Sequence, residues 1–147
     1  MSSLKVYRRS ELFAQSLTKE INVLNQRLGL ALEFANMGVW DYDPVNNILI
    51  WDDKQFEIFG IDKISFEGLF SAWVNALHPE DRERASQESQ KAVANKHNFN
   101  SEFRIIKNGE VRFIKGQAIV VLDANQNVVR MIGVNYDVTE TKETLTS

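Results

Sequence analysis

The residues whose side chains are able to do chemistry are few in this sequence. The two histidines, His78 and His97, lie far apart and have no companion ligands at the spacing of a zinc site. The absence of cysteine excludes disulfides, thiolate metal sites and thiol nucleophiles. The glycines form no phosphate-binding loop, and no Gly-x-Ser-x-Gly segment marks a nucleophilic serine. A regulatory or binding function is therefore favoured over catalysis, although a Ser-His-Asp triad assembled only in space stays open.

The composition predicts one globular domain. The 147 residues are 44% hydrophobic and 10% aromatic, which provides the apolar surface for a single core. A net charge of -3 argues against non-specific binding to nucleic acid. The longest apolar run, residues 118–122, is too short to cross a bilayer, and the N-terminus lacks the apolar segment of a secretory signal. We expect a cytoplasmic domain without membrane insertion, and an anchor in a longer parent protein stays open.

Residues 1–36 predict an amphipathic helix. Its apolar stripe contains Leu17, Ile21, Leu24 and Leu28 and continues through Ala31 and Ala35, at alternating spacings of four and three residues, as in a coiled coil. The stripe is narrow because the side chains beside it are polar, and a narrow stripe suits a partner helix. Two interpretations stay open: the helix forms a homodimer and carries a signal, or it lies on its own domain.

The rest of the chain alternates between strand and helix patterns. Pro44 and the asparagines after it favour a turn between two β-prone segments. Asp52 or Asp53 is suited to cap a short helix that ends at Gly60, and residues 108–109, Asn-Gly, are a strong hairpin signal. The expected strands are residues 39–43, residues 48–51, residue 99 to the Asn-Gly turn, residues 110–122 and residues 128–138. Two further helices are expected at residues 66–76 and 79–95, the second opened by His78 and Pro79.

Four segments carry a resemblance to a known family. They are Gly38–Asp43, Ile50–Gly60, Leu77–Arg82, and the stretch from Phe103 through the Asn-Gly turn to Glu140. Together they resemble the PAS/PAC class of bacterial sensor proteins over about residues 30–142. The resemblance implies an α+β PAS fold, with a five-stranded antiparallel sheet, short helices on one face and an N-terminal amphipathic helix. It also implies a regulatory sensor domain at residues 37–140 that reports to a C-terminal effector, with residues 141–147 beginning the linker to it.

The segment Asp137-Val138-Thr139 matches the family's Asp-x-Thr signalling motif. In the family the aspartate is tied to a basic side chain, and the threonine caps the outgoing helix. The residues agree, because Arg112 or Lys115 on the neighbouring strand is able to pair with Asp137, and Thr139 is a good N-cap. The alternative is a capped helix start without a signalling role.

A cavity between helices and sheet is the expected place for a ligand of such a domain. Its candidate lining residues are Trp40, Trp51, Phe56, Phe59, Phe103 and Asn135, and ordinary core packing is the alternative interpretation of these aromatics. The cofactor is left open. Haem is disfavoured because residues 79–95 contain no histidine, a cysteinyl flavin is excluded, and a noncovalent flavin is less favoured than no cofactor.

The sequence thus supports two hypotheses of function. The first is a sensor that detects a small molecule, a redox cue or a partner, and relays it to a histidine kinase or GGDEF effector. The second is a cofactor-free module for dimerisation or protein interaction. A dry, closed core favours the second hypothesis, whereas a polar cavity with a perturbed carboxylate favours a third and more distant one, an enzyme.

Overall fold

The computed structural model describes the backbone of residues 2–146 and the side chains of residues 8–143. The chain divides into two units, Met1–Ala35 and Asn36–Ser147. The first unit is a single helix, α1 (Ser2–Ala35), as the sequence predicts. Its apolar stripe is exposed in the chain, with Leu17 at 47% and Leu24 at 60%.

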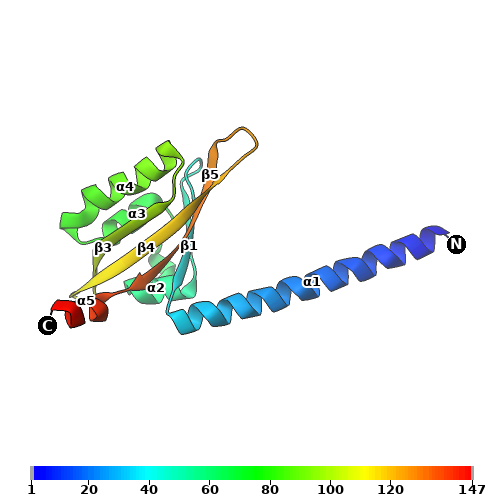
Figure 1. Cartoon of the computed structure of the whole chain (residues 1–147), viewed down its shortest axis with the longest axis horizontal. Coiled ribbons are helices and arrows are strands. Elements are labelled where there is room, and N and C mark those ends of the chain that lie inside the picture. The colour runs from blue at the N-terminus through cyan, green and yellow to red at the C-terminus, as the bar shows by residue number, and fades with distance from the viewer. Residues whose placement is uncertain (1, 147) are drawn as a thin grey trace. The chain divides into compact units, whose positions relative to one another are not determined.

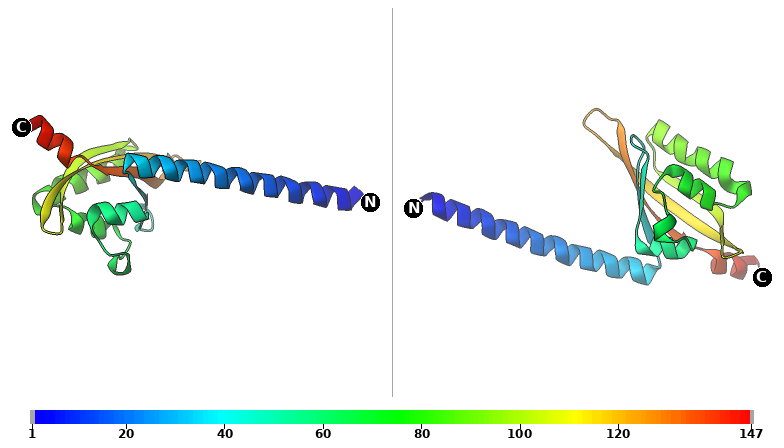
Figure 2. Two further views of the ribbon diagram at one scale, coloured as in Figure 1. Left: turned by 90° about the horizontal axis from the view of Figure 1, so that it is seen from below. Right: turned by 180° about the vertical axis from the view of Figure 1, so that it is seen from behind.

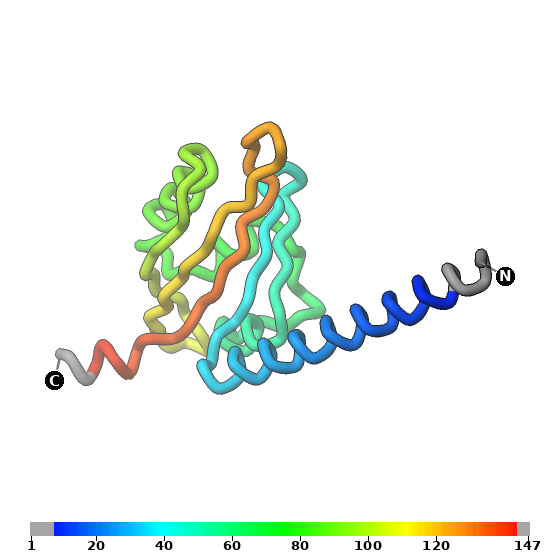
Figure 3. The backbone as a smooth tube through the Cα atoms, turned by 45° about the vertical axis from the view of Figure 1, so that its right-hand side comes forward, coloured from blue at the N-terminus to red at the C-terminus, as the bar shows by residue number. Residues whose placement is uncertain are grey.

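The second unit is built on a five-stranded antiparallel sheet with the spatial order β2-β1-β5-β4-β3 (Figure 1). The last strand in the sequence, β5, lies in the middle of the sheet and leads directly into the outgoing helix α5 (Thr139–Thr146) (Figure 3). The outgoing helix therefore continues directly from the central strand of the sheet. The strands are β1 (Gly38–Asp43), β2 (Ile48–Trp51), β3 (Phe99–Lys107), β4 (Glu110–Leu122) and β5 (Val128–Asp137).

Short-range signals account for the hairpins. The Asp43 carboxylate accepts hydrogen bonds from the backbone N–H groups of Val45 and Asn46, at 2.9 and 3.0 Å, and so orders the turn between β1 and β2. Asn108 and Gly109 have φ values of 50° and 82°, the left-handed pair that a two-residue hairpin requires. Both hairpins are confirmed where the sequence places them.

The helices between β2 and β3 cover one face of the sheet (Figure 2). In α2, the Asp52 carboxylate accepts from the backbone N–H of Gln55 at 2.9 Å, and Gly60 ends the helix in the left-handed conformation, as predicted. The helical elements are α2 (Asp53–Phe59), η1 (Lys63–Ser65), α3 (Phe70–Ala76), η2 (Pro79–Asp81) and α4 (Arg82–Asn95). The last two meet end to end, because the predicted start at Pro79 is one 3₁₀ turn that continues as α4.

The predicted start of the second helix at residue 66 is wrong. The helix α3 begins only at Phe70, because Gly68 has a positive φ of 70°, which a helix interior does not accommodate. The carbonyl oxygen of Gly68 accepts a hydrogen bond from the N–H of Leu49 at 2.7 Å, so this segment pairs with the edge strand β2 before the helix starts.

The core lies between the covered face of the sheet and the helices, and it is rich in aromatic rings. Trp51 packs against Phe56, Phe59 and Phe66, with ring centroids 5.3, 4.6 and 4.4 Å away. Trp73 lies edge-on to Phe103 at 5.5 Å. Such contacts bury large apolar areas and fix ring orientation, so they supply much of the domain's stability.

Candidate functional site

A row of small and polar residues crosses the covered face of the sheet. Strand register places Gly38 of β1, Asn135 of β5, Gly116 of β4 and Ser101 of β3 opposite one another. Asn135 is 2% exposed and Ser101 is 3% exposed. We call these four residues the polar row. It leaves a strip without bulky apolar side chains in an otherwise aromatic core.

Gln55 of α2 lies above the polar row. It is fully buried, and neither its Nε2 nor its Oε1 atom has a hydrogen-bond partner among the described residues. A Cβ atom on residue 38 would lie 2.3 Å from Gln55 Oε1, so the glycine there is what lets the amide approach the sheet. Beside it, the Trp40 indole N–H donates to Asn135 Oδ1 at 3.2 Å.

These groups line a small cavity of about 30 Å³. Of the predicted lining residues, Trp40, Trp51, Phe103 and Asn135 line it, whereas Phe56 and Phe59 do not. Those two rings stack on Trp51 within the core, because the turn of α2 directs Gln55 to the cavity in their place. The other lining residues are Tyr42, Leu49, Gln55, Phe70, Trp73, Ser89 and Phe99, and none of the lining side chains carries a formal charge.

Sequence reasoning missed Gln55 and Ser89. A glutamine among Phe56, Ile58 and Phe59 reads as the exposed side of a short helix, and Ser89 lies in a polar stretch of α4. The available signal was Gly38, whose missing side chain marks a close approach by another element.

The volume of the cavity limits which of the cofactors considered from the sequence can bind there. A volume of about 30 Å³ has room for roughly two water molecules, which is far less than a flavin or a haem requires. His97, the histidine nearest the end of α4, is exposed, and its Nδ1 lies 2.9 Å from the carbonyl oxygen of Asn98. Among the described residues there is also no group of three His, Cys, Asp or Glu that is placed to hold a metal ion. In this conformation the residues fit neither flavin nor haem.

The second part of the candidate site is the junction between β5 and α5. Arg112 Nε donates to Asp137 Oδ2 at 2.8 Å, and the backbone N–H of Thr139 donates to Asp137 Oδ1 at 2.8 Å. The sequence left Arg112 and Lys115 as alternatives, and the structure pairs Arg112 with the aspartate. One carboxylate thus ties β4, β5 and the first residue of α5 together.

Thr139 is not the N-cap that the sequence favours. Its hydroxyl oxygen accepts from the backbone N–H of Phe113 at 2.8 Å, across the sheet, while Asp137 accepts from the N–H of Thr139. The reason is geometric, because Val138 N–H also donates to the Phe113 carbonyl at 2.8 Å and so keeps the chain paired with β4 up to the helix. Thr139 therefore anchors the helix start to the sheet.

The hydrogen bonds at this junction stabilise the charged forms of Asp137 and Arg112. Partial burial raises the pKa of Asp137, but the hydrogen bonds from Arg112 and Thr139 lower it by more, and the pKa lies below its ordinary value. The hydrogen bond to Asp137 raises the pKa of Arg112. The pair is therefore ionised near neutral pH.

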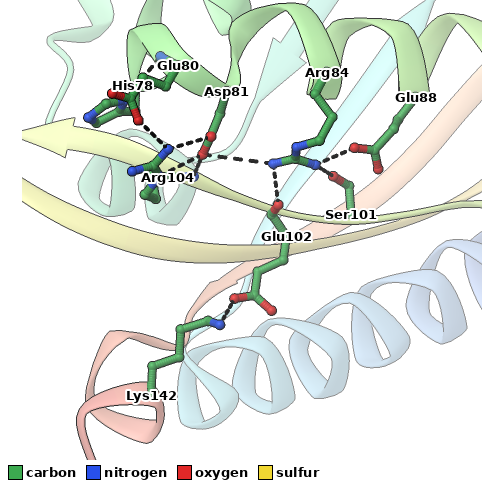
Figure 4. A network of polar contacts seen from close by, with 9 residues as sticks. All are labelled: His78, Glu80, Asp81, Arg84, Glu88, Ser101, Glu102, Arg104 and Lys142. Carbon is green, nitrogen blue, oxygen red and sulfur yellow. Dashed lines mark hydrogen bonds and ion pairs between the residues drawn. The ribbon is translucent and has the colours of Figure 1, made fainter. Parts of the chain in front are cut away.

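A third polar cluster covers the free edge of β3 (Figure 4). Asp81 accepts from the backbone N–H of Arg104 at 2.7 Å and from its Nη2 at 2.8 Å, while Arg84 Nη2 donates to the Glu102 carbonyl at 2.8 Å. His78 caps the 3₁₀ turn, as expected, by accepting from the Glu80 N–H at 3.1 Å. The hydrogen bond from Arg104 lowers the pKa of Asp81. The cluster satisfies backbone groups that an edge strand leaves unpaired.

Comparison with known proteins identifies the family. The PAS fold family matches residues 48–135, and the chain belongs to it. The probable diguanylate cyclase DgcE of Escherichia coli K12 is 32% identical over 127 residues, which cover 86% of this chain and 11% of DgcE. The chain thus spans about a tenth of the length of this curated relative.

Solved structures share the fold. A sensory box histidine kinase/response regulator from Burkholderia thailandensis has a TM-score of 0.67 at 22% identity, covering 82% of this chain and 90% of that one. The PAS domain of a Colwellia psychrerythraea protein has a TM-score of 0.60 at 25% identity, covering 80% of this chain and 98% of that one. The α+β PAS fold expected from the sequence is confirmed. Within residues 2–146, none of the helices combines the length and the apolar character needed to cross a bilayer.

Proposed function

We propose that this chain is a regulatory sensor domain. It binds a small molecule in the cavity and relays the binding signal to a C-terminal effector of the histidine kinase or GGDEF type. The observation that carries the proposal is the position of β5. This one strand places Asn135 in the cavity wall and, two residues later, Asp137 at the start of the outgoing helix. DgcE is named as a probable diguanylate cyclase, which supports an effector of the GGDEF type.

The hydrogen bonds of β5 support a route for the proposed relay. A ligand that engages the cavity competes for the Asn135 amide oxygen, which Trp40 of β1 otherwise uses. A shift of β5 at Asn135 changes the register or twist of the strand at Asp137, and Asp137 is bonded to both Arg112 and Thr139. The direction of α5 then has two states, which the ligand biases by its different affinity for each of them.

The test is a double-mutant cycle in a chimera that joins residues 1–147 to a diguanylate cyclase domain. Asn135→Leu changes the cavity and Asp137→Asn changes the junction, and cyclic-di-GMP synthesis is measured for each variant alone and for both. We expect Asn135→Leu to change the output severalfold with the native junction and to have no effect in the Asp137→Asn background. Asp123→Asn, the same chemical change in the β4–β5 turn, is the matched control. Independent effects of the two substitutions would contradict the relay.

A second candidate function, a cofactor-free dimerisation module, rests on α1. Ile21 and Leu28 are 49% and 58% exposed, so the stripe that also contains Leu17 and Leu24 has an apolar surface to offer another helix. Ile21→Asp with Leu24→Asp is expected to dissociate a dimer in sedimentation equilibrium. Asn22→Asp with Gln26→Asp adds the same charge on the polar side of the helix and should leave the dimer intact. A monomeric wild-type chain would rule this candidate out.

A further inference from the structure

We propose that the cavity selects a small uncharged ligand with a lactam-type edge, an N–H beside a C=O in one plane, held by the Gln55 amide. This inference rests on the proposed function, because it names the ligand class of the same cavity. It starts from Gln55, whose two polar side-chain atoms are buried and without partners among the described residues. A buried amide in that state costs about 1–3 kcal/mol for each unsatisfied group. Packing alone would favour an apolar residue here.

The polar groups around the cavity come from the sheet and from two helices. Gln55, Asn135 and Ser101 lie within or directly above the polar row, and Ser89 of α4 lines the same space at 6% exposure. The domain's other buried polar side chains, Asp81 and Thr139, are satisfied by backbone or ionic partners. Asn135 accepts from Trp40 and Ser101 from Arg84, so among the described residues Gln55 is the buried polar side chain at the cavity whose two polar atoms have no partner.

The lining excludes a charged ligand. None of the side chains that line the cavity carries a formal charge, so an ion would lose its hydration without a counter-charge. The nearest guanidinium connected to the polar row belongs to Arg84, which bonds Ser101 at 3.4 Å and is already paired with Glu88. A neutral ligand is what the walls accept.

The geometry of the Gln55 side-chain amide defines which hydrogen-bonding groups the ligand has to present. Gln55 offers a donor, Nε2–H, and an acceptor, Oε1, side by side in one plane. A lactam edge presents the reverse pair, so both hydrogen bonds form at once, while Trp40, Trp73 and Phe103 supply flat apolar walls for the rest of the ring. A free volume of about 30 Å³ holds roughly two water molecules, so even a single small ring enters only if the cavity widens, and larger ligands are disfavoured.

The test uses δ-valerolactam as the probe and N-methyl-δ-valerolactam as the matched control that lacks only the donor. Titration is followed through the Gln55 side-chain amide and the Trp40 indole signals in ¹H–¹⁵N NMR spectra of the whole chain. We expect δ-valerolactam to shift both signals saturably, and the N-methyl compound to bind about tenfold more weakly or worse. Gln55→Met should weaken δ-valerolactam binding by about tenfold and abolish the preference between the two compounds.

The outcomes separate this inference from the proposed function. Equal affinity for the two compounds, no saturable shift with either, or an unchanged affinity in Gln55→Met would overturn the ligand class. The comparison of the two compounds uses the wild-type chain, so it stands even if the variant folds poorly. Asp123→Asn lies outside both the cavity and the Asp137 junction and should bind δ-valerolactam as the wild type does. A failed relay in the chimera together with intact lactam binding would reject only the relay.

Discussion

Two buried polar regions of this domain differ in how completely their hydrogen bonds are made. At the edge of β3, both carboxylate oxygens of Asp81 are bonded to Arg104. In the cavity, both polar atoms of Gln55 lack partners among the described residues. The first region contains charges that are paired, whereas the second is neutral and contains the unpaired Gln55 amide. The contrast indicates that the Asp81 contacts serve the fold, whereas the open Gln55 amide is the basis of the ligand class that we propose.

The largest expected effect is at the paired region. Asp81→Ala leaves the Arg104 backbone N–H without its acceptor and the guanidinium with only the exposed Glu80, and we expect a loss of about 3 kcal/mol in the free energy of unfolding measured with urea. Glu80→Ala is the matched control, because Glu80 bonds the same guanidinium but its side chain is 73% exposed. That variant should lose less than about 0.5 kcal/mol. Equal losses would show that the edge cluster is not what holds β3.

The next effect concerns the close approach of α2 to the sheet. Gly38→Ala places a methyl group 2.3 Å from Gln55 Oε1 and 2.8 Å from its Cα, so the backbone of α2 has to move. We expect a loss of about 2 kcal/mol in urea unfolding, together with a shifted Gln55 amide signal. Gly29→Ala is the control, since nothing lies within 4 Å of its added methyl group. A stable Gly38→Ala variant with an unmoved Gln55 signal would contradict the packing described.

A smaller effect depends on pH. The folded-state pKa of Asp137 lies below its ordinary value of 3.8, so the stability from its bonds is present above that value and is lost as pH falls through the lowered pKa. We expect Asp137→Asn to lose about 1 kcal/mol at pH 7 and to show a shallower decline in stability below pH 4 than the wild type. Unfolding curves measured at several pH values check this.

Local features of the fold were predictable from the sequence, and features set by strand register were not. The two hairpins and the α2 caps depend on neighbouring residues such as Asp43, Asp52 and Gly60, which are visible in sequence. The late start of α3 depends on a hydrogen bond from Leu49, far away in the sequence. The cap expected of Thr139 failed for the same reason, because Phe113 of β4 uses its hydroxyl.

The residues of the candidate site also fall into those that were predictable from local sequence and those that depend on strand register. The Asp137 junction was predictable because its motif is contiguous and its basic partner lies on an adjacent strand. The polar row was only partly predictable, since Gly38, Asn135, Gly116 and Ser101 come from four strands and meet only through their register. Asn135 was found as an isolated candidate, whereas Gln55 above it was not.

The most direct test of the central claim is the stability of Gln55→Met in the absence of ligand. If Gln55 is unsatisfied and kept for a ligand, replacing its amide by an apolar group of similar volume should raise the free energy of unfolding by about 1 kcal/mol in urea. Gln90→Met, at an exposed position of α4, should change it by less than about 0.5 kcal/mol. A loss of more than about 1 kcal/mol in Gln55→Met would show that the amide is part of the domain's own packing, and would contradict the claim.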